Sequence, residues 1–467
     1  MPERVVIVGG GFAGLGVARR LERRLPDADV RLVSPDDYML YLPLLPQVAA
    51  GVLPPTAVTA SLTRRLTRAT FVPGRVIGVD LDRRRVVSTS ITGRREILDY
   101  DRLVLAPGSI TRTMDIPGLR EYGRGMKTLA EAQFLRDHVL GQLELANASD
   151  DPDERALRCR FVVVGGGYAG VETAANLELM TSGLARRFHR LDPSQVQWHL
   201  VQHGAQLMPE LGPRLGEDTR QVLLRRGVHV HLRTSLASAD DCSVTLSDGR
   251  RLETNTLVWT AGVSPNPLVS RLGVDSEEGR LVVGADFAVP GHPEVFALGD
   301  CAAVPDLVAG NGAVCPPTAQ HATRQAPVAA DNVVASLRGR RPRRYRHRDL
   351  GLVVDLGGPD AVAKPLHLDL SGRPAQIVTR GYHLVAMGAP VAMARVAGNW
   401  ALHAVAGNSS VRLGFLTRSS GRLAEFEHTD DYLTPEQACE AAEQGGDPVP
   451  GATADVPTTT GPADRAR

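Results

Sequence analysis

Cysteine is scarce in this chain of 467 residues, and the cysteines that it has follow no pattern. An odd, scattered set without a C-x2-C or C-x4-C pair argues against a metal site and against a redox-active disulfide. It also indicates a reducing compartment, so we expect a cytoplasmic protein that holds no metal. The five cysteines are Cys159, Cys242, Cys301, Cys315 and Cys439.

Long apolar runs and an excess of one charge are absent too. No uninterrupted apolar stretch reaches about 18 residues, so no helix is predicted to span a bilayer. A formal net charge of +1 gives no global electrostatic reason to expect nucleic acid as a partner.

Lysine is rare as well. Only Lys127 and Lys364 among the 53 basic residues are lysines, which we interpret as a background bias. The first apolar strand begins close to Met1, so we expect no signal peptide.

What the sequence does contain is a strand and a glycine-rich turn near its start. The strand Val-Val-Ile-Val at residues 5–8 is followed by the turn at residues 9–14 and by apolar residues at helical spacing. Such glycines let the backbone approach a pyrophosphate at a helix N-terminus, although an ordinary tight turn is the alternative for a single GxGxxG. The cofactor contacts predicted here are Gly9, Gly11, Phe12, Ala13 and Gly14.

The same phrase occurs again at residues 161–170, as Phe-Val-Val-Val-Gly-Gly-Gly-Tyr-Ala-Gly. The two turns are separated by about 150 residues, the spacing expected for two nucleotide-binding domains in one chain. Two turns imply two dinucleotides, and one chemical reason to hold both is electron transfer between a nicotinamide and a flavin. The contacts predicted in the second turn are Gly165, Gly167, Tyr168, Ala169 and Gly170.

The order of the remaining segments predicts an α/β fold with two Rossmann-like domains, the second inserted in the first. Short strands and turns after residue 74 and after residue 228 predict a β-meander in each domain. The last 50 residues are rich in Glu, Asp, Thr, Pro and Gly, a composition typical of disorder. The predicted units are a FAD-binding domain at 1–115 and 287–341, an NAD(P)H-binding domain at 116–286, a membrane-association or dimerisation region at 342–417 and a disordered tail at 418–467.

Two apolar segments lie outside these strands. Prolines prevent the loop at residues 38–46 from forming a long helix, so it either folds onto the core or lines a pocket for a flavin or lipophilic substrate. Residues 384–405 are apolar but interrupted by Pro390 and Arg395. They predict either a membrane-surface segment or a docking helix.

Taken together, these motifs resemble those of the pyridine-nucleotide-disulfide-reductase-like flavoproteins, and among them the type II NADH dehydrogenases. Residues 38–51, residues 127–129 with the helix after them, and residues 316–325 carry the closer match. The last stretch, Pro-Pro-Thr-Ala-Gln-His-Ala-Thr-Arg-Gln, fits the AQxxxxQ quinone-site pattern of that family. The resemblance covers residues 4–416. It implies FAD as cofactor, NADH or NADPH as donor, a quinone as acceptor and a peripheral position on the inner face of the cell membrane, and it leaves a homodimer open.

The residues themselves give reasons for several of these roles. Pro316 and Pro317 suit the start of a helix whose positive end is expected to stabilise an anionic reduced flavin. Gln320 and Gln325 are predicted to offer amide donors to a quinone, with surface glutamines as the alternative. Asp300, after Gly299, is predicted to accept hydrogen bonds from the ribityl chain of FAD, with a helix N-cap as the alternative.

By resemblance, Glu172 lies near the flavin and the nicotinamide on the first turn of its helix, where it positions the nicotinamide or relays a proton. A carboxylate that complements the helix dipole is the alternative. Further cofactor contacts implied by the resemblance are Pro43, Ala106, Gly108, Ala261, Gly262 and Ala319.

Two positions depart from the usual pattern, in which the second strand of a Rossmann unit ends in an acidic residue that binds a ribose diol. The first unit has Ser34, a variant that looks familiar within the family, so FAD binding is still expected. The second has Gln202 followed by His203, which removes the charge that would repel a 2′-phosphate. NADPH therefore stands beside NADH, although no arginine directly follows Gln202, which favours NADH.

Two rival functions remain. A sulfide:quinone oxidoreductase or disulfide reductase would need paired cysteines at the flavin, and Cys301 and Cys315 belong to no paired motif. A redox-sensing flavoprotein without turnover would retain the fold while Gln202 weakens nicotinamide binding.

Overall fold

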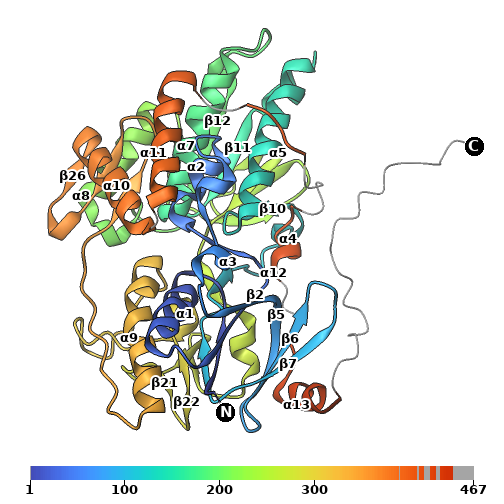
Figure 1. Cartoon of the computed structure of the whole chain (residues 1–467). Coiled ribbons are helices and arrows are strands. Elements are labelled where there is room, and N and C mark those ends of the chain that lie inside the picture. Colours follow the sequence, from blue (N-terminus) through green and yellow to red (C-terminus); the bar gives the residue numbers. More distant parts are fainter. Residues whose placement is uncertain (1, 389, 408–409, 415–420, 428–431, 445–467) are drawn as a thin grey trace, which may run out of the picture.

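The chain folds into two lobes, each built on a parallel β-sheet (Figure 1). The computed structural model describes residues 2–388, 390–407, 410–414, 421–427 and 432–444. The lower lobe of Figure 1 contains an eight-stranded sheet in the order β21-β22-β8-β1-β2-β5-β6-β7. Its strands are β1 (Arg4–Val8), β2 (Asp29–Ser34), β5 (Thr70–Asp80), β6 (Arg85–Ser90), β7 (Arg95–Asp99), β8 (Arg102–Leu105), β21 (Ala288–Val289) and β22 (His292–Ala297).

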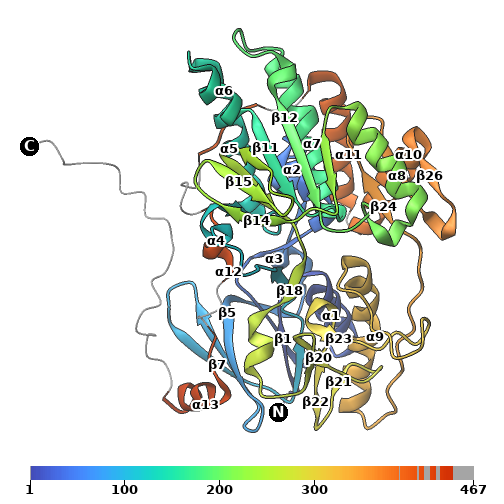
Figure 2. The same cartoon turned by 180° about the vertical axis from the view of Figure 1, so that it is seen from behind.

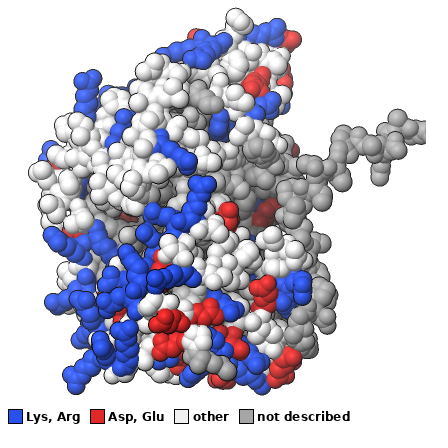
Figure 3. Space-filling model, viewed as in Figure 1, with Lys and Arg blue, Asp and Glu red and all other residues white. Residues whose placement is uncertain are grey.

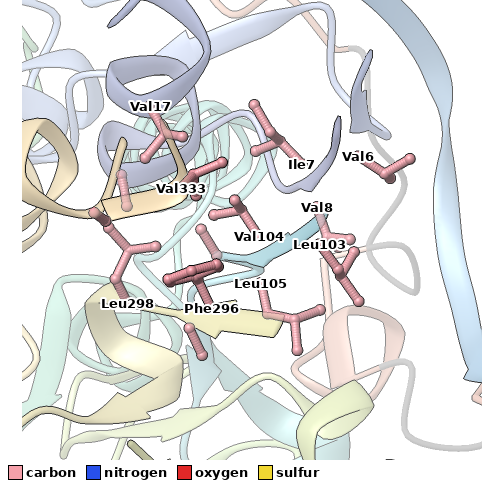
Figure 4. Packing of buried hydrophobic residues seen from close by; sticks show 14 of the residues in the cluster. Val6, Ile7, Val8, Val17, Leu103, Val104, Leu105, Phe296, Leu298 and Val333 are labelled. Carbon is pink, nitrogen blue, oxygen red and sulfur yellow. The ribbon is translucent and has the colours of Figure 1, made fainter. Parts of the chain in front are cut away.

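The first lobe has its core where helices α1 (Phe12–Arg24) and α9 (Ala319–Leu337) pack side by side against this sheet. Strands β22, β8, β1, β2 and β5 run parallel, and β5, β6 and β7 form the predicted antiparallel meander. Figure 4 shows Ile7, Val104 and Phe296 of the sheet close to Val17 and Val333 of the two helices. Burial of these branched apolar side chains fixes the strand that leads into the first glycine turn.

The second lobe repeats this plan with five parallel strands in the order β10-β17-β11-β12-β13. Its helix α5 begins with a capping box in which Thr128 and Glu131 satisfy each other's backbone N–H groups. The antiparallel strands β14 to β16 form the second meander (Figure 2). The elements are β10 (Gly123–Arg124), β11 (Arg160–Val164), β12 (Gln197–Gln202), β13 (His229–Leu232), β14 (Leu236–Ala239), β15 (Ser243–Leu246), β16 (Arg251–Glu253), β17 (Thr256–Trp259), α4 (Leu119–Tyr122), α5 (Leu129–Ala148), α6 (Pro152–Arg158), α7 (Tyr168–Ala185) and α8 (Pro213–Arg225).

The chain crosses between the lobes on two strands that pair antiparallel, β9 (Ser109–Thr111) and β18 (Val263–Pro265). Figure 2 shows β18 between the two lobes. Leu268 and Leu281 already belong to the core of the first lobe. The return crossing therefore lies at β18, before the boundary predicted at residue 286. Strands β19 (Ser276–Glu277) and β20 (Arg280–Val282) support this, because β20 pairs with β23 (Ala302–Ala303), which follows β22 of the first sheet.

The C-terminal region packs on the second lobe. It consists of the sheet β24 (Val353–Asp355), β25 (Ala361–Ala363) and β26 (Leu370–Ser371) and of helices α10 (Gly372–Met387) and α11 (Pro390–Ala406). Pro390 opens α11 rather than interrupting it, as suits the first turn of a helix. Trp400 of α11 belongs to the same core as the apolar residues 41–58. That loop, with β3 (Tyr38–Leu40), α2 (Leu45–Ala49), β4 (Thr59–Ser61) and α3 (Leu62–Arg65), thus folds onto the core.

The prediction of a disordered tail is wrong for the parts of it that the structure describes. Helix α12 (Ala424–Glu427) follows Leu423, which is buried in the second lobe. Helix α13 (Pro435–Gln444) lies beside the first meander (Figure 1), where Ala441 and Ala442 pack against Ile77. Average composition hides this apolar face because it is made of small alanines. Residues 418–420, 428–431 and 445–467 of the predicted tail lie outside the described residues.

Candidate functional site

The first glycine turn connects β1 to α1 and needs glycine for two reasons. Gly9 has a φ of +101°, and a Cβ on it would overlap the carbonyl oxygen of Ala106. A Cβ on Gly14 would overlap the carbonyl oxygen of Gly9. Gly11 is different, because a Cβ there would meet no described atom within 4 Å. Two glycines thus close the turn and the third leaves open space in front of a helix N-terminus, which fits a pyrophosphate.

The second turn, between β11 and α7, repeats this geometry. Gly165 has a φ of +120° and packs against Thr260, while a Cβ on Gly170 would overlap the carbonyl oxygen of Gly165. A Cβ on Gly167 would again meet no described atom within 4 Å. The predicted pair of dinucleotide turns therefore has one geometry in both lobes. Phe12 with Ala13, and Tyr168 with Ala169, form the first turns of α1 and α7.

The remaining backbone contacts predicted around the two turns follow strand ends. Gly108 has a φ of +76° and open space before it, directly after β8 and Ala106. Ala261 and Gly262 occupy the corresponding position after β17, and Arg112 is the nearest neighbour of Gly262. Ser34 and Gln202 end the second strands of the two lobes and contact the middle glycine of each turn. Pro43 lies in the short helix Leu42–Leu44, away from these strand ends in the chain.

Asp300 follows the turn at Leu298–Gly299, three residues after the end of β22, and contacts Ser109 of the crossing strand β9. Its Oδ2 accepts a hydrogen bond of 2.6 Å from the Ser109 hydroxyl. Asp300 and Ser109 line a cavity of about 560 Å³, together with Arg112, Arg280 and Pro317. A carboxylate that lines a cavity of this kind fits the hydroxyl groups of a sugar-alcohol chain.

Lys127 is a functional residue that sequence reasoning missed. Its Nζ donates to the Ser109 hydroxyl at 2.7 Å and lies 3.8 Å from Asp300 Oδ2. Burial lowers the pKa of Lys127, and the carboxylates of Asp300 and Glu131 oppose that shift. The rarity of lysine was the available signal: one of the two lysines in a chain rich in arginine lies beside the Asp300 carboxylate.

Glu172 is the fifth residue of α7 and points into the protein, so it does not lie on the first turn and does not serve as a dipole partner at the surface. Its Oε1 accepts a hydrogen bond of 2.9 Å from the backbone N–H of Asp355. Burial raises the pKa of the Glu172 carboxyl well above its usual value of 4.5, and the neighbouring Asp355 carboxylate raises it further. Glu172 thus keeps its proton to a higher pH than an exposed glutamate does.

Asp355 connects Glu172 to the C-terminal helices through a buried network that the sequence did not reveal. Asp355 Oδ2 accepts a hydrogen bond of 2.7 Å from the Gln47 amide. The Gln47 carbonyl in turn accepts one of 2.7 Å from the indole N–H of Trp400. Gln376 donates to Asp355 Oδ1 at 3.2 Å. The network therefore joins α7, α2, β24, α10 and α11 through the backbone and side chain of Asp355 and through Gln47.

Replacing Glu172 by Gln should stabilise the protein at higher pH. A carboxyl whose pKa is raised by folding contributes stability below its unfolded pKa and loses it as the pH rises toward its folded pKa. Since glutamine does not titrate and retains the acceptor for Asp355 N–H, the variant should gain about 1.4 kcal/mol over wild type for each pH unit in that window. Chemical denaturation from pH 5 to pH 8 measures this. A stability difference that stays constant with pH would contradict it.

Gln320 and Gln325 lie on α9 but face different partners. Helix α9 begins at Ala319, with Thr318 as its N-cap, and not at the prolines before it. Gln320 donates to the carbonyl oxygen of Gly351 at 3.2 Å and is partly exposed. Gln325 is 1% exposed, and its amide oxygen accepts a hydrogen bond of 2.8 Å from Gly299 N–H.

The Gln325 amide oxygen is thus engaged inside the protein, and the donor role of Gln325 toward a quinone stays a prediction. Five residues along an α-helix turn the side chain by about 140° away from that of Gln320. Gln325 holds the backbone of the turn that precedes Asp300, whereas Gln320 is partly exposed near the start of the helix and donates to Gly351.

The cysteines show no reactive arrangement. All five are free, and Cys301 and Cys315 are buried. Burial raises the pKa of the Cys301 thiol to about 12 and that of Cys315 to about 11. Both thiols are thereby kept from the thiolate form that disulfide exchange or sulfide chemistry requires.

The two dinucleotide turns, the buried parallel strands that lead into them and the crossing at β9 and β18 define a flavin and nicotinamide oxidoreductase fold. The model of the pyridine nucleotide-disulphide oxidoreductase family matches residues 3–326, so the chain belongs to that family. Type II NADH:quinone oxidoreductase Ndh of Mycobacterium tuberculosis is 33% identical over 405 residues, which cover 82% of this chain and 84% of the relative. Within the larger family, the chain therefore belongs to the type II NADH:quinone oxidoreductases.

Other relatives agree with this assignment. Demethylphylloquinone reductase NdbB of Synechocystis is 29% identical over 391 residues, 81% of this chain and 90% of that protein. The structure of NDH2 from Plasmodium falciparum in complex with NADH has a TM-score of 0.81 at 18% identity, and the match covers 88% of this chain and all of the other. That structure shows the same fold. Among the helices of the described residues, none is both long and apolar enough to cross a bilayer.

Proposed function

We propose that this protein is a FAD-dependent NAD(P)H:quinone oxidoreductase that works at a membrane surface. The observation that carries the proposal is the pair of open glycine turns, one in each lobe, with the lobes joined by the paired strands β9 and β18. FAD, when bound, supplies a two-electron acceptor for the nicotinamide and a two-electron donor for the quinone.

The first lobe would hold FAD. Gly9, Gly11 and Gly14 would bind its pyrophosphate at the start of α1, and Asp300 would accept the ribityl hydroxyls. Ser109 and Lys127 hold Asp300 in place, and Gln325 holds the backbone of the same turn. The start of α9, next to Pro317 of the cavity that Asp300 lines, would direct N–H groups and the partial positive charge of the helix toward the cofactor. We assign residues 1–115 and the segment from β18 to residue 341 to this lobe.

The second lobe would bind the nicotinamide nucleotide at Gly165, Gly167 and Gly170. Glu172 lies two residues after Gly170 on α7, and its raised pKa lets it hold a proton in a dry environment. We assign it the role of positioning the nicotinamide and supplying a proton during quinone reduction, with Gln320 as an amide donor to the quinone.

An anaerobic titration tests this function. The purified protein should carry FAD, and stoichiometric NADH or NADPH should bleach its oxidised-flavin absorption promptly. A soluble quinone should restore the band. A protein that takes up no FAD, or a yellow protein that neither nucleotide bleaches, would refute the proposal; the second outcome would favour a redox sensor.

We further propose that α10 and α11 lie against the inner face of the cell membrane. Their exposed side chains include Ile377, Val385, Val391 and Leu402, each more than half exposed. The segment that leads to this region, residues 338–348, carries seven exposed arginines. Figure 3 shows basic side chains gathered on the lower left of this face, below a largely uncharged area. Apolar side chains beside cations fit a surface of anionic lipid.

Placing aspartate at Val385 and Val391 should weaken vesicle binding. The two valines are 75% and 66% exposed on either side of the α10–α11 connection, so their replacement leaves the core intact. Each valine contributes about 1.5 kcal/mol when buried, so the double variant should partition at least tenfold more weakly. Sedimentation with phosphatidylglycerol vesicles measures this, and Val308→Asp, at an equally exposed valine of the first lobe, is the matched control. Equal sedimentation of the double variant and the control would contradict membrane contact at these helices.

A further inference from the structure

The position that usually distinguishes NADH from NADPH holds an uncharged residue in this protein, and that side chain is already hydrogen-bonded within the protein. Gln202 ends β12, where a Rossmann unit places the carboxylate that binds the ribose diol. The Gln202 Oε1 accepts a hydrogen bond of 2.9 Å from Gly166 N–H, and its Nε2 lies 3.4 Å from the carbonyl oxygen of Gln206. The side chain is 7% exposed. It therefore supports the glycine turn and offers no acceptor to a ribose diol.

An arginine from another segment takes the neighbouring position. Gln202 and Leu232 are partners in the parallel strands β12 and β13, so the chain leaves the same sheet edge at His203 and at Arg233. Arg233 N–H donates to the carbonyl oxygen of Gly204 at 3.0 Å, and Thr234 N–H donates to that of Gln202 at 3.0 Å. The fold thus ties Arg233 to the turn after the second strand, although no arginine follows Gln202 in sequence.

The Arg233 side chain is positioned to bind an anion. Arg233 has a φ of +54°, in the left-handed region that glycine adopts most readily. The chain therefore carries an arginine side chain where the backbone conformation favours glycine. Arg233 and His203 are both exposed. Within the described residues, neither their guanidinium nor their imidazole group has a hydrogen bond or ion pair. The two turns, residues 202–206 and 233–235, contain no acidic residue.

We propose that this edge binds the 2′-phosphate of NADPH, with Arg233 as its counter-charge and His203 as a further donor. The inference rests on the proposed function and specifies its donor. A guanidinium matches the geometry of a phosphate, and the absence of a carboxylate removes the repulsion by which NADH-specific units exclude it. The protein uses NADPH at least as well as NADH.

Flavin bleaching by each nucleotide tests the inference in the purified holoprotein. Wild type should show a kcat/KM for NADPH equal to or above that for NADH. Arg233→Gly, which also suits the positive φ, should lower the NADPH value about tenfold and leave the NADH value within twofold. Gln202→Glu should also lower the NADPH value, because it keeps the acceptor for Gly166 N–H and restores the negative charge. Arg187→Ala, at an exposed arginine beyond the far end of α7, should change neither.

Calorimetric binding of adenosine 2′,5′-bisphosphate, compared with adenosine 5′-monophosphate, tests the phosphate site without turnover. Wild type should prefer the bisphosphate at least tenfold, and Arg233→Gly should lose the preference. A wild type that reduces its flavin with NADH but is a hundredfold poorer with NADPH would overturn the inference and leave the proposed function standing. Failure of both nucleotides would refute the proposed function, and equal binding of the two adenosine phosphates would independently refute the phosphate site.

Discussion

Gly11→Val should give a colourless protein that is folded and stable. The backbone at Gly11 has φ −74° and ψ −163°, which valine adopts readily, and no described atom lies within 4 Å of the new Cβ. The side chain would instead fill the space assigned to the pyrophosphate. We expect FAD to bind at least 100-fold more weakly, a loss of about 2.7 kcal/mol. Flavin content after purification and fluorescence titration with FAD measure the effect.

Stability provides the control for this variant. Its free energy of unfolding without cofactor should lie within about 0.5 kcal/mol of that of wild type apoprotein, because the substitution is made at an open surface. Gly183→Val, at an exposed glycine on α7 with equally open space, should keep its flavin. Full flavin content in Gly11→Val would mean that the first turn is not the FAD site.

Gly167→Val should give the complementary result: a yellow protein that nicotinamide nucleotides cannot reduce. Gly167 has φ −78° and ψ −173° and the same open space, but lies in the second lobe. FAD should remain bound, while the rate of flavin reduction at a fixed, subsaturating NADH or NADPH concentration should fall at least 100-fold. Anaerobic stopped-flow absorption at the oxidised-flavin band measures this.

Dithionite separates the two steps in Gly167→Val. It should reduce the flavin of the variant as in wild type, and a soluble quinone should reoxidise it at the wild-type rate. If instead Gly167→Val lost its flavin while Gly11→Val kept it, the assignment of the two lobes would have to be exchanged.

The two turns were predictable because their requirements are local. A strand of branched apolar residues, a glycine that must have positive φ, a glycine that must pack against its own turn and an open glycine follow one another within ten residues. The repeat of that order at residues 161–170 fixed two Rossmann-like lobes and two dinucleotides. The strand ending in Gly299-Asp300 was likewise recognisable from its own residues.

Side-chain direction and averaged composition did not reveal contacts with distant segments of the chain. Gln325 follows Gln320 in one motif, yet the helix turns it toward Gly299. The tail was assigned to disorder from its average composition, yet α13 buries two alanines on the first meander. In both cases the deciding contact lies far from the residue in sequence.

The two dinucleotide-binding lobes follow from the residues of the turns alone, because backbone sterics over a few residues leave little alternative to glycine there. The surroundings of the turns depend on contacts between distant segments. The hydrogen bond between Asp355 and Glu172 spans 183 positions, that between Ser109 and Asp300 spans 191, and Arg233 reaches the turn after Gln202 from the neighbouring strand. Such contacts follow from how strands and helices pack, and packing is a property of the whole chain that no local pattern of residues contains.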